Sequence, residues 1–166
     1  RKKVTVCHKA NILKYTQGLF LDVARETAAK YPDIQFDEKI VDAACMHMVM
    51  NPQQFDVVVT TNMFGDILSD LTAGLVGGLG LIPGANIGDD AALFEAVHGS
   101  APDIAGKNLA NPAAVIMAGV MMLNHLGEFE AAKRVDNAIK KVVREGRYVT
   151  PDLNPHSKCG TKEMGD

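Results

Sequence analysis

Residues 55–75 read FDVVVTTNMFGDILSDLTAGL, a short apolar run followed by a longer helical pattern. The three consecutive valines at 57–59 are typical of a strand that is buried on both faces, as strands of parallel sheets are. Residues 65–75 then carry apolar side chains at helical spacing. This stretch predicts a strand that leads directly into a helix, which is the repeating unit of a layered α/β protein.

The same alternation precedes this stretch. Residues 3–8 alternate and are rich in valine and threonine, as strands are, and residues 18–30 have helical spacing until Pro32 stops the helix. Residues 34–41 predict a second strand, and residues 43–50 predict a short helix. Three strand–helix pairs in succession therefore predict an α/β layer architecture.

The composition changes at residue 77. Residues 77–88 contain five glycines and a proline, which marks the expected domain border or hinge. Beyond the glycine-rich part, the sequence predicts a strand at 91–97, a polar loop at 98–111, an apolar helix at 112–126 and an amphipathic helix at 128–144.

Bulk properties exclude several classes of protein. A formal net charge of −3, with both signs scattered along the 166 residues, offers no basic surface to nucleic acid. The longest apolar run, residues 113–123, is shorter than the ~20 residues of a membrane-spanning helix, and the first residues do not resemble a signal peptide. Three widely spaced cysteines, an odd number without metal or redox spacing, fit a reduced intracellular setting.

Two aspartates, Asp66 and Asp70, lie four residues apart near the start of the predicted helix. Acidic residues are common at helix N-termini, so a solvated helix face is one interpretation. These two, however, follow a strand of the parallel type, and α/β proteins bind ligands at the carboxyl ends of such strands. Paired carboxylates at that place suit Mg²⁺ or Mn²⁺.

Three further polar residues follow strands. Lys9 and Asn11 come after the first strand, and their spacing places both on one side if the strand continues. A lysine near a metal ion can act as a general base, although spacing alone favours an edge lysine with a turn asparagine. Asp42 ends the second strand, where it is either a helix cap or a third metal carboxylate.

Residues 95–106 read EAVHGSAPDIAG and are the most informative loop of the chain. Small residues and exposed amides allow a phosphate or adenine to approach closely, and Asp103 can accept hydrogen bonds from ribose hydroxyls. For His98 alone, a structural histidine is the simpler interpretation. The glycines of residues 75–80 do not form a Rossmann fingerprint, because a helix precedes them where a strand is required.

Five stretches resemble the isocitrate/isopropylmalate dehydrogenase family. They are His8-Lys-Ala-Asn-Ile12, Ile40-Val-Asp42, Asn62-Met-Phe-Gly-Asp-Ile-Leu-Ser-Asp70, Gly84-Ala-Asn-Ile-Gly88, and residues 95–112. The resemblance implies a non-Rossmann α/β fold that is incomplete in this chain. Residues 1–76 would be the C-terminal part of a small, dimer-forming domain, and residues 77–166 the C-terminal part of a large, NAD-binding domain.

The resemblance also implies a role for each candidate residue. Asp66 and Asp70 would bind the divalent metal together with Asp42 of a partner subunit, and Lys9 would assist removal of the substrate hydroxyl proton. The NAD site would comprise Asn11 beside the nicotinamide, Asn111 near the adenine, and Glu95, His98, Gly99, Ser100, Ala101, Asp103 and Ile104. The pair Asp103-Ile104 stands where NADP-type relatives place a lysine and a tyrosine.

The chain most resembles the C-terminal half of an NAD-dependent isocitrate dehydrogenase, a cytoplasmic enzyme (mitochondrial in eukaryotes) of the tricarboxylic acid cycle. The implied reaction is oxidative decarboxylation of isocitrate to 2-oxoglutarate by a homodimer or higher oligomer with shared active sites, without nucleic-acid or membrane partners. The alternatives are an isopropylmalate or homoisocitrate dehydrogenase, a regulatory subunit without activity, and a fragment that only dimerises. The substrate-gripping arginines and the enolate-protonating tyrosine of the family are absent from this sequence.

Overall fold

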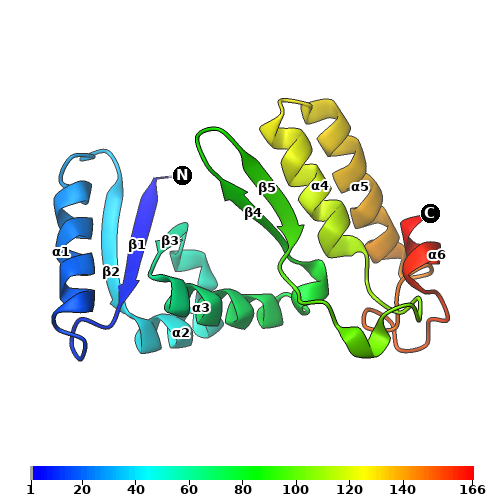
Figure 1. The fold of residues 1–166 in the computed structure, drawn as a ribbon, viewed down its shortest axis with the longest axis horizontal. Coiled ribbons are helices and arrows are strands. Elements are labelled where there is room, and N and C mark those ends of the chain that lie inside the picture. Colours follow the sequence, from blue (N-terminus) through cyan, green and yellow to red (C-terminus); the bar gives the residue numbers. More distant parts are fainter. Residues whose placement is uncertain (1) are drawn as a thin grey trace. The chain divides into compact units, whose positions relative to one another are not determined.

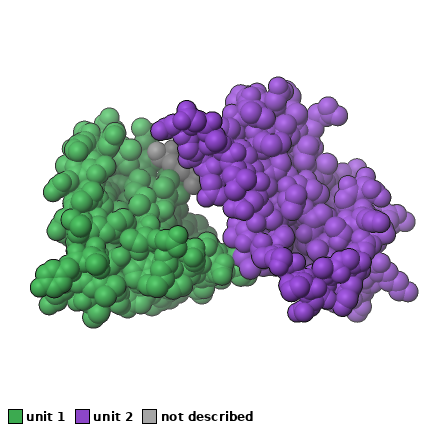
Figure 2. Space-filling model, viewed as in Figure 1, with its two compact units in different colours: residues 1–75 green, residues 76–166 purple. Residues whose placement is uncertain are grey.

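The computed structural model describes residues 2–166 and divides the chain into two compact units, Arg1–Leu75 and Val76–Asp166 (Figure 2). The division falls next to the glycine-rich stretch that begins at Gly77. Gly77 and Gly78 both have positive φ angles, 113° and 111°, a conformation that side chains disfavour and that explains why glycines stand here.

Unit 1 is an α/β layer built around a parallel sheet (Figure 1). The chain alternates strands and helices, in the order β1 (Lys3–His8), α1 (Thr16–Ala28), β2 (Gln35–Ile40), α2 (Val41–Met50), β3 (Val57–Val59) and α3 (Asn62–Leu75). The strand order is β2-β1-β3, and both pairings are parallel, with Val4 opposite Phe36 and Val57. The predicted α/β fold is confirmed.

Alternation along β1 sends side chains to two different layers. Cys7 is fully buried in a core cluster with Ala44 and Met48 of α2 and Leu68 of α3. Val4 and Val6, by contrast, line an apolar cavity together with side chains of α1. The central strand therefore has helices against both faces, which is why its sequence shows hydrophobic residues on both sides.

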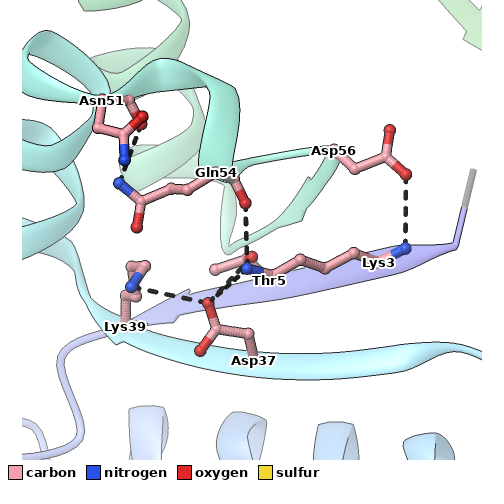
Figure 3. A network of polar contacts seen from close by, with 7 residues as sticks. All are labelled: Lys3, Thr5, Asp37, Lys39, Asn51, Gln54 and Asp56. Atoms are coloured by element: carbon pink, nitrogen blue, oxygen red, sulfur yellow. Dashed lines mark hydrogen bonds and ion pairs between the residues drawn. The ribbon is translucent and has the colours of Figure 1, made fainter.

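A network of polar side chains joins β1, β2 and the 3-10 helix Pro52–Gln54 (Figure 3). Lys3 Nζ lies 3.3 Å from Asp37 Oδ2 and donates to the Gln54 carbonyl oxygen at 3.0 Å. Lys39 Nζ approaches the same Asp37 oxygen at 3.6 Å. Burial raises the pKa of Asp37, but the hydrogen bond from Lys3 and the charges of both lysines outweigh it, so the net pKa is lowered.

We expect Asp37→Asn to destabilise the protein by about 1–2 kcal/mol at pH 7, because two half-buried lysines lose their charged partner. A lowered pKa means that the ionised carboxylate stabilises the fold above the ordinary aspartate pKa, near 4, and that this stability is lost as the pH falls through the folded value. Urea unfolding at a series of pH values below 7 should therefore show that the difference in unfolding free energy between wild type and Asp37→Asn becomes smaller in acid. Asp33→Asn, on an exposed turn, is the control, and a pH-independent difference would contradict this account.

Unit 2 combines a hairpin with helices. Its elements are the 3-10 helix Leu79–Leu81, β4 (Pro83–Ile87), β5 (Ala92–Ala96), the 3-10 helix Pro102–Ile104, α4 (Ala113–His125), α5 (Phe129–Glu145) and α6 (Thr161–Gly165). β4 and β5 pair antiparallel, and a second core cluster contains Ala113, Ile139, Val149 and Met164. In the part of the chain that the structure describes, the helices are too short or too polar to cross a membrane.

The glycine-rich stretch of residues 77–88 also contains a strand, β4, which the sequence did not predict. The strand begins at Pro83, a position where a sheet tolerates the missing N–H. Gly84 packs within β4 where an added Cβ would lie 3.2 Å from a methyl carbon of Val97. The glycine thus permits a close approach between the two strands, which the local sequence does not show.

Candidate active site

The three parallel strands of unit 1 end at one edge, and predicted site residues follow each of them. Lys9 comes directly after β1, and Asp42 lies in the first turn of α2 after β2. Asp66 lies in α3, which begins three residues after the end of β3. Ligands of α/β proteins bind at this edge, so the fold itself places these residues where chemistry is expected.

Lys9 and Asp42 form an ion pair, with 2.6 Å between Lys9 Nζ and Asp42 Oδ1. The pairing of β1 with β2 explains it, because His8 and Ile40 lie opposite each other at the strand ends. The hydrogen bond from Lys9, aided by backbone amides of α2, holds the pKa of Asp42 below its usual range. Both are predicted site residues, but no pattern in the sequence indicates that they contact each other within one chain.

The turn that carries Lys9 is held by a residue that the sequence analysis did not name. Gln17 is 7% exposed, accepts a hydrogen bond from the Lys9 N–H at 3.3 Å, and donates to Thr61 Oγ1 at 3.2 Å. His8 Nδ1 accepts from the Ala10 N–H at 3.1 Å, and burial lowers the pKa of His8, which favours the neutral ring that this bond requires. Gln17 precedes the predicted helix of residues 18–30, so no local pattern in the sequence marks it as a site residue.

Asn11 does not lie as the extended-strand spacing suggested. β1 ends at His8, and the Lys9 carbonyl accepts hydrogen bonds from the Ile12 and Leu13 N–H groups at 3.0 and 2.9 Å. These bonds close a turn in which Asn11 is exposed. Its proposed place beside the nicotinamide therefore rests on the family resemblance and not on strand geometry.

The paired carboxylates of α3 lie on the helix surface. Asp66 and Asp70 are both exposed and separated by one helical turn, so they share a face. Among residues 2–166, no group of three or more His, Cys, Asp or Glu side chains is arranged to hold a metal ion. Two exposed carboxylates fit a hard cation such as Mg²⁺ or Mn²⁺ that keeps further positions for other oxygen ligands. Completion of the set by Asp42 of a second subunit stays a prediction.

A cavity of about 750 Å³ in unit 2 collects most of the residues predicted for NAD. Its lining includes His98, Gly99, Ser100, Ala101, Ile104 and Asn111. Within residues 2–166, Glu95 and Asp103 lie outside that lining. Glu95 instead accepts a hydrogen bond from Asn86 Nδ2 at 3.0 Å across the hairpin, and Asp103 is exposed on the 3-10 helix Pro102–Ile104.

The wall of this cavity contains two non-glycine residues in the left-handed region, Ala101 with φ 43° and Asn108 with φ 57°. Asparagine tolerates this conformation, but alanine pays on the order of 1 kcal/mol for it. Contacts with the rest of unit 2 must offset this cost. The isolated loop of residues 98–101 would favour a different backbone conformation at Ala101.

The C-terminal residues hold the Asn108 side of the wall. Asn108 Nδ2 donates to Glu163 Oε2 at 3.0 Å, and its backbone oxygen accepts from the Thr161 N–H at 3.1 Å. Glu163 Oε2 also accepts from the Gly160 N–H at 2.8 Å. A Cβ at position 160 would overlap the Asn108 backbone oxygen, so only glycine permits this contact. Neither α6 nor this contact was predicted from the sequence.

We expect Gly160→Ala to cost about 1–3 kcal/mol of stability, because backbone rather than a flexible side chain must move away. The cavity wall should open at the same time, so affinity for NAD should also fall. Thermal unfolding and NAD titration measure the two effects. Gly165→Ala is the matched control, since a Cβ there meets no atom within 4 Å, and equal stability of both variants would contradict the prediction.

Comparison with known proteins identifies the family. The family description "Isocitrate/isopropylmalate dehydrogenase" matches residues 1–166. The chain belongs to this family. It is 60% identical over 158 residues to a 3-isopropylmalate dehydrogenase of Archaeoglobus fulgidus, covering 95% of this chain and 48% of that protein. It is 54% identical to a probable mitochondrial NAD isocitrate dehydrogenase subunit alpha of Drosophila melanogaster, covering 96% of this chain and 42% of that protein.

Solved structures agree with this assignment. The isocitrate dehydrogenase from Methylococcus capsulatus superposes with a TM-score of 0.95 at 68% identity, over 99% of this chain and 48% of that chain. The family fold, incomplete in this chain, is therefore confirmed. The chain spans about half the length of the relatives it matches. Its assignment to their C-terminal half stays a prediction, as do the small-domain and large-domain roles of the two units.

Proposed function

We propose that the full-length protein oxidises and decarboxylates isocitrate to 2-oxoglutarate, with NAD as oxidant and Mg²⁺ or Mn²⁺ as metal. The observation that carries the proposal is the Lys9–Asp42 ion pair at the carboxyl edge of the parallel sheet. The cavity of unit 2, lined by His98, Ala101 and Asn111, supports a dinucleotide site.

In this proposal each candidate site residue of unit 1 has a defined role. Asp66 and Asp70 hold the metal ion, which when bound supplies a Lewis acid and a template for the substrate oxygens. Lys9 Nζ, as a neutral amine, would take up the proton that leaves the substrate hydroxyl, and Asp42 would hold the ammonium group that results until its proton returns to solvent. NAD, held by the residues that line the unit 2 cavity, would supply the acceptor for the hydride of the carbinol carbon, and the β-keto acid so formed would be able to lose CO₂.

The test is a comparison of three substrates. Full-length protein with NAD and Mn²⁺ should form NADH and release CO₂ from isocitrate with a higher kcat/KM than from 3-isopropylmalate or homoisocitrate. No NADH with any of the three would overturn the proposal. A preference for 3-isopropylmalate would establish the second candidate, which the 60% identity to the Archaeoglobus enzyme favours.

The presence of Lys9, Asp42, Asp66 and Asp70 together supports a catalytic rather than a regulatory role. We further propose a cytoplasmic location, or the mitochondrial matrix if the protein is eukaryotic. The second alternative is supported by the Drosophila relative, which is named as mitochondrial.

We expect the full-length protein to be at least a homodimer with shared active sites, because Lys9 and Asp42 would serve the metal site of the other subunit. An inactive Lys9→Met variant mixed with an inactive Asp70→Asn variant should then regain part of the activity, since some sites combine two intact halves. Sedimentation gives the oligomeric state. An active monomer, or mixtures as inactive as the single variants, would contradict this prediction.

A further inference from the structure

One charged side chain of the unit 2 cavity has no role in the proposed function. Among the described residues that line the cavity, Asp152 is the single Asp, Glu, Lys or Arg. It lies in the turn that follows Thr150, distant in sequence from the loop of residues 98–111. Its carboxylate Oδ2 accepts a hydrogen bond from Asn111 Nδ2 at 2.9 Å.

The Asn111 amide is engaged at both ends. Its nitrogen donates to Asp152, and its oxygen Oδ1 accepts from the Ala113 N–H at 2.9 Å, at the start of α4. Rotating the amide by 180° would set its oxygen against the carboxylate and its NH₂ against an N–H donor. Both hydrogen bonds would be lost, so Asp152 and α4 together define which way the amide faces. One N–H of Asn111 remains for a further acceptor.

The charge of Asp152 also limits what part of a ligand lies beside it. The cavity lining provides no lysine or arginine, within residues 2–166, to balance a phosphate there. A phosphate next to an uncompensated carboxylate would be repelled, whereas a neutral base that carries nitrogen acceptors would not. The Asp152–Asn111 end of the cavity therefore suits a purine base.

We propose that Asp152 is a positioning residue for the cofactor: it holds the Asn111 amide so that the amide donates to the adenine base. This inference rests on the proposed function, in which the cavity receives the adenosine part of NAD. Asp152 acts through Asn111, so its contribution depends on the asparagine being present.

The experiment uses the full-length protein with four variants: Asp152→Ala, Asp152→Asn, Asn111→Ala and the double alanine variant. Asp152→Ala should raise the KM for NAD about tenfold with kcat nearly unchanged, since one hydrogen bond to the base is misplaced. Asp152→Asn keeps an oxygen acceptor and should restore KM to within about twofold. In the Asn111→Ala variant, the further change Asp152→Ala should raise the KM for NAD by less than about twofold, because Asp152 acts only through Asn111.

Direct binding separates this inference from the proposed function. Wild type should bind AMP, and Asp152→Ala should bind it about tenfold more weakly, with nicotinamide mononucleotide unaffected. If wild type binds neither NAD nor AMP, the cofactor cavity itself is refuted. If wild type binds AMP and Asp152→Ala binds it equally well, the role of Asp152 alone is refuted.

Two controls complete the design. Asp90→Ala removes an exposed carboxylate from the hairpin turn of the same unit and should leave KM and AMP affinity unchanged. Asp152→Ser, whose shorter side chain cannot reach Asn111 Nδ2, replaces Asp152→Ala if that variant does not fold. Equal KM values for Asp152→Ser and Asp152→Asn would overturn the proposal.

Discussion

Replacing Lys9 by methionine in the full-length protein should lower kcat by about a thousandfold, with a much smaller effect on the KM for NAD. Lys9 Nζ is the basic group that the structure holds at the carboxyl edge of the sheet, 2.6 Å from Asp42 Oδ1. Methionine keeps the length of the side chain and removes its ability to carry a proton. The loss therefore reports on proton transfer rather than on packing.

The test needs a control that removes a lysine elsewhere in the same unit. Lys30→Met, which removes an exposed lysine just beyond α1, is the control. A Lys9→Met variant that retained a tenth or more of wild-type kcat would exclude Lys9 from catalysis.

The sequence predicted unit 1 well because its elements carry strong local patterns. The valines of β3 and the spacing of α1 and α3 appear within short windows, and the structure has strands and helices at those places. The end of β1 was harder to predict, because the turn after His8 depends on hydrogen bonds that Gln17 and His8 accept from backbone N–H groups, and spacing does not reveal them. The condition for placing Asn11 beside Lys9, that the strand continues past His8, is not met for this reason.

In unit 2 the residues that shape the cavity come together from distant parts of the chain. Asn111 and Asp152 are 41 positions apart, and Asn108 and Glu163 are 55 positions apart. Each looks like an ordinary loop or helix-end residue in its own neighbourhood. The loop of residues 95–106 could be predicted as a binding loop because its own composition is unusual. Asp152 and Glu163, which hold the cavity wall, lie in sequence that gives no such indication.

The preference for NAD over NADP should be about a hundredfold or more in kcat/KM, and Asp103→Lys should reduce it at least tenfold. Asp103 lies exposed on the 3-10 helix Pro102–Ile104, directly before Ile104, which lines the cavity. A carboxylate there can accept hydrogen bonds from both ribose hydroxyls of NAD. It would repel the 2′-phosphate of NADP, which carries nearly two negative charges.

A competing explanation gives Asp103 only the role of a turn residue after Pro102, with Lys107 supplying a positive charge for the 2′-phosphate. Lys107 follows closely, and its N–H donates to the Ile104 carbonyl at 3.1 Å. The two explanations differ in the variant Lys107→Met, which should leave the cofactor ratio unchanged if Asp103 decides it. Asp89→Lys, on the exposed hairpin turn, makes the same charge change as Asp103→Lys away from the cavity and is the control. A wild-type ratio near one, or a ratio that Asp103→Lys and Asp89→Lys alter equally, would show that Asp103 does not select the cofactor.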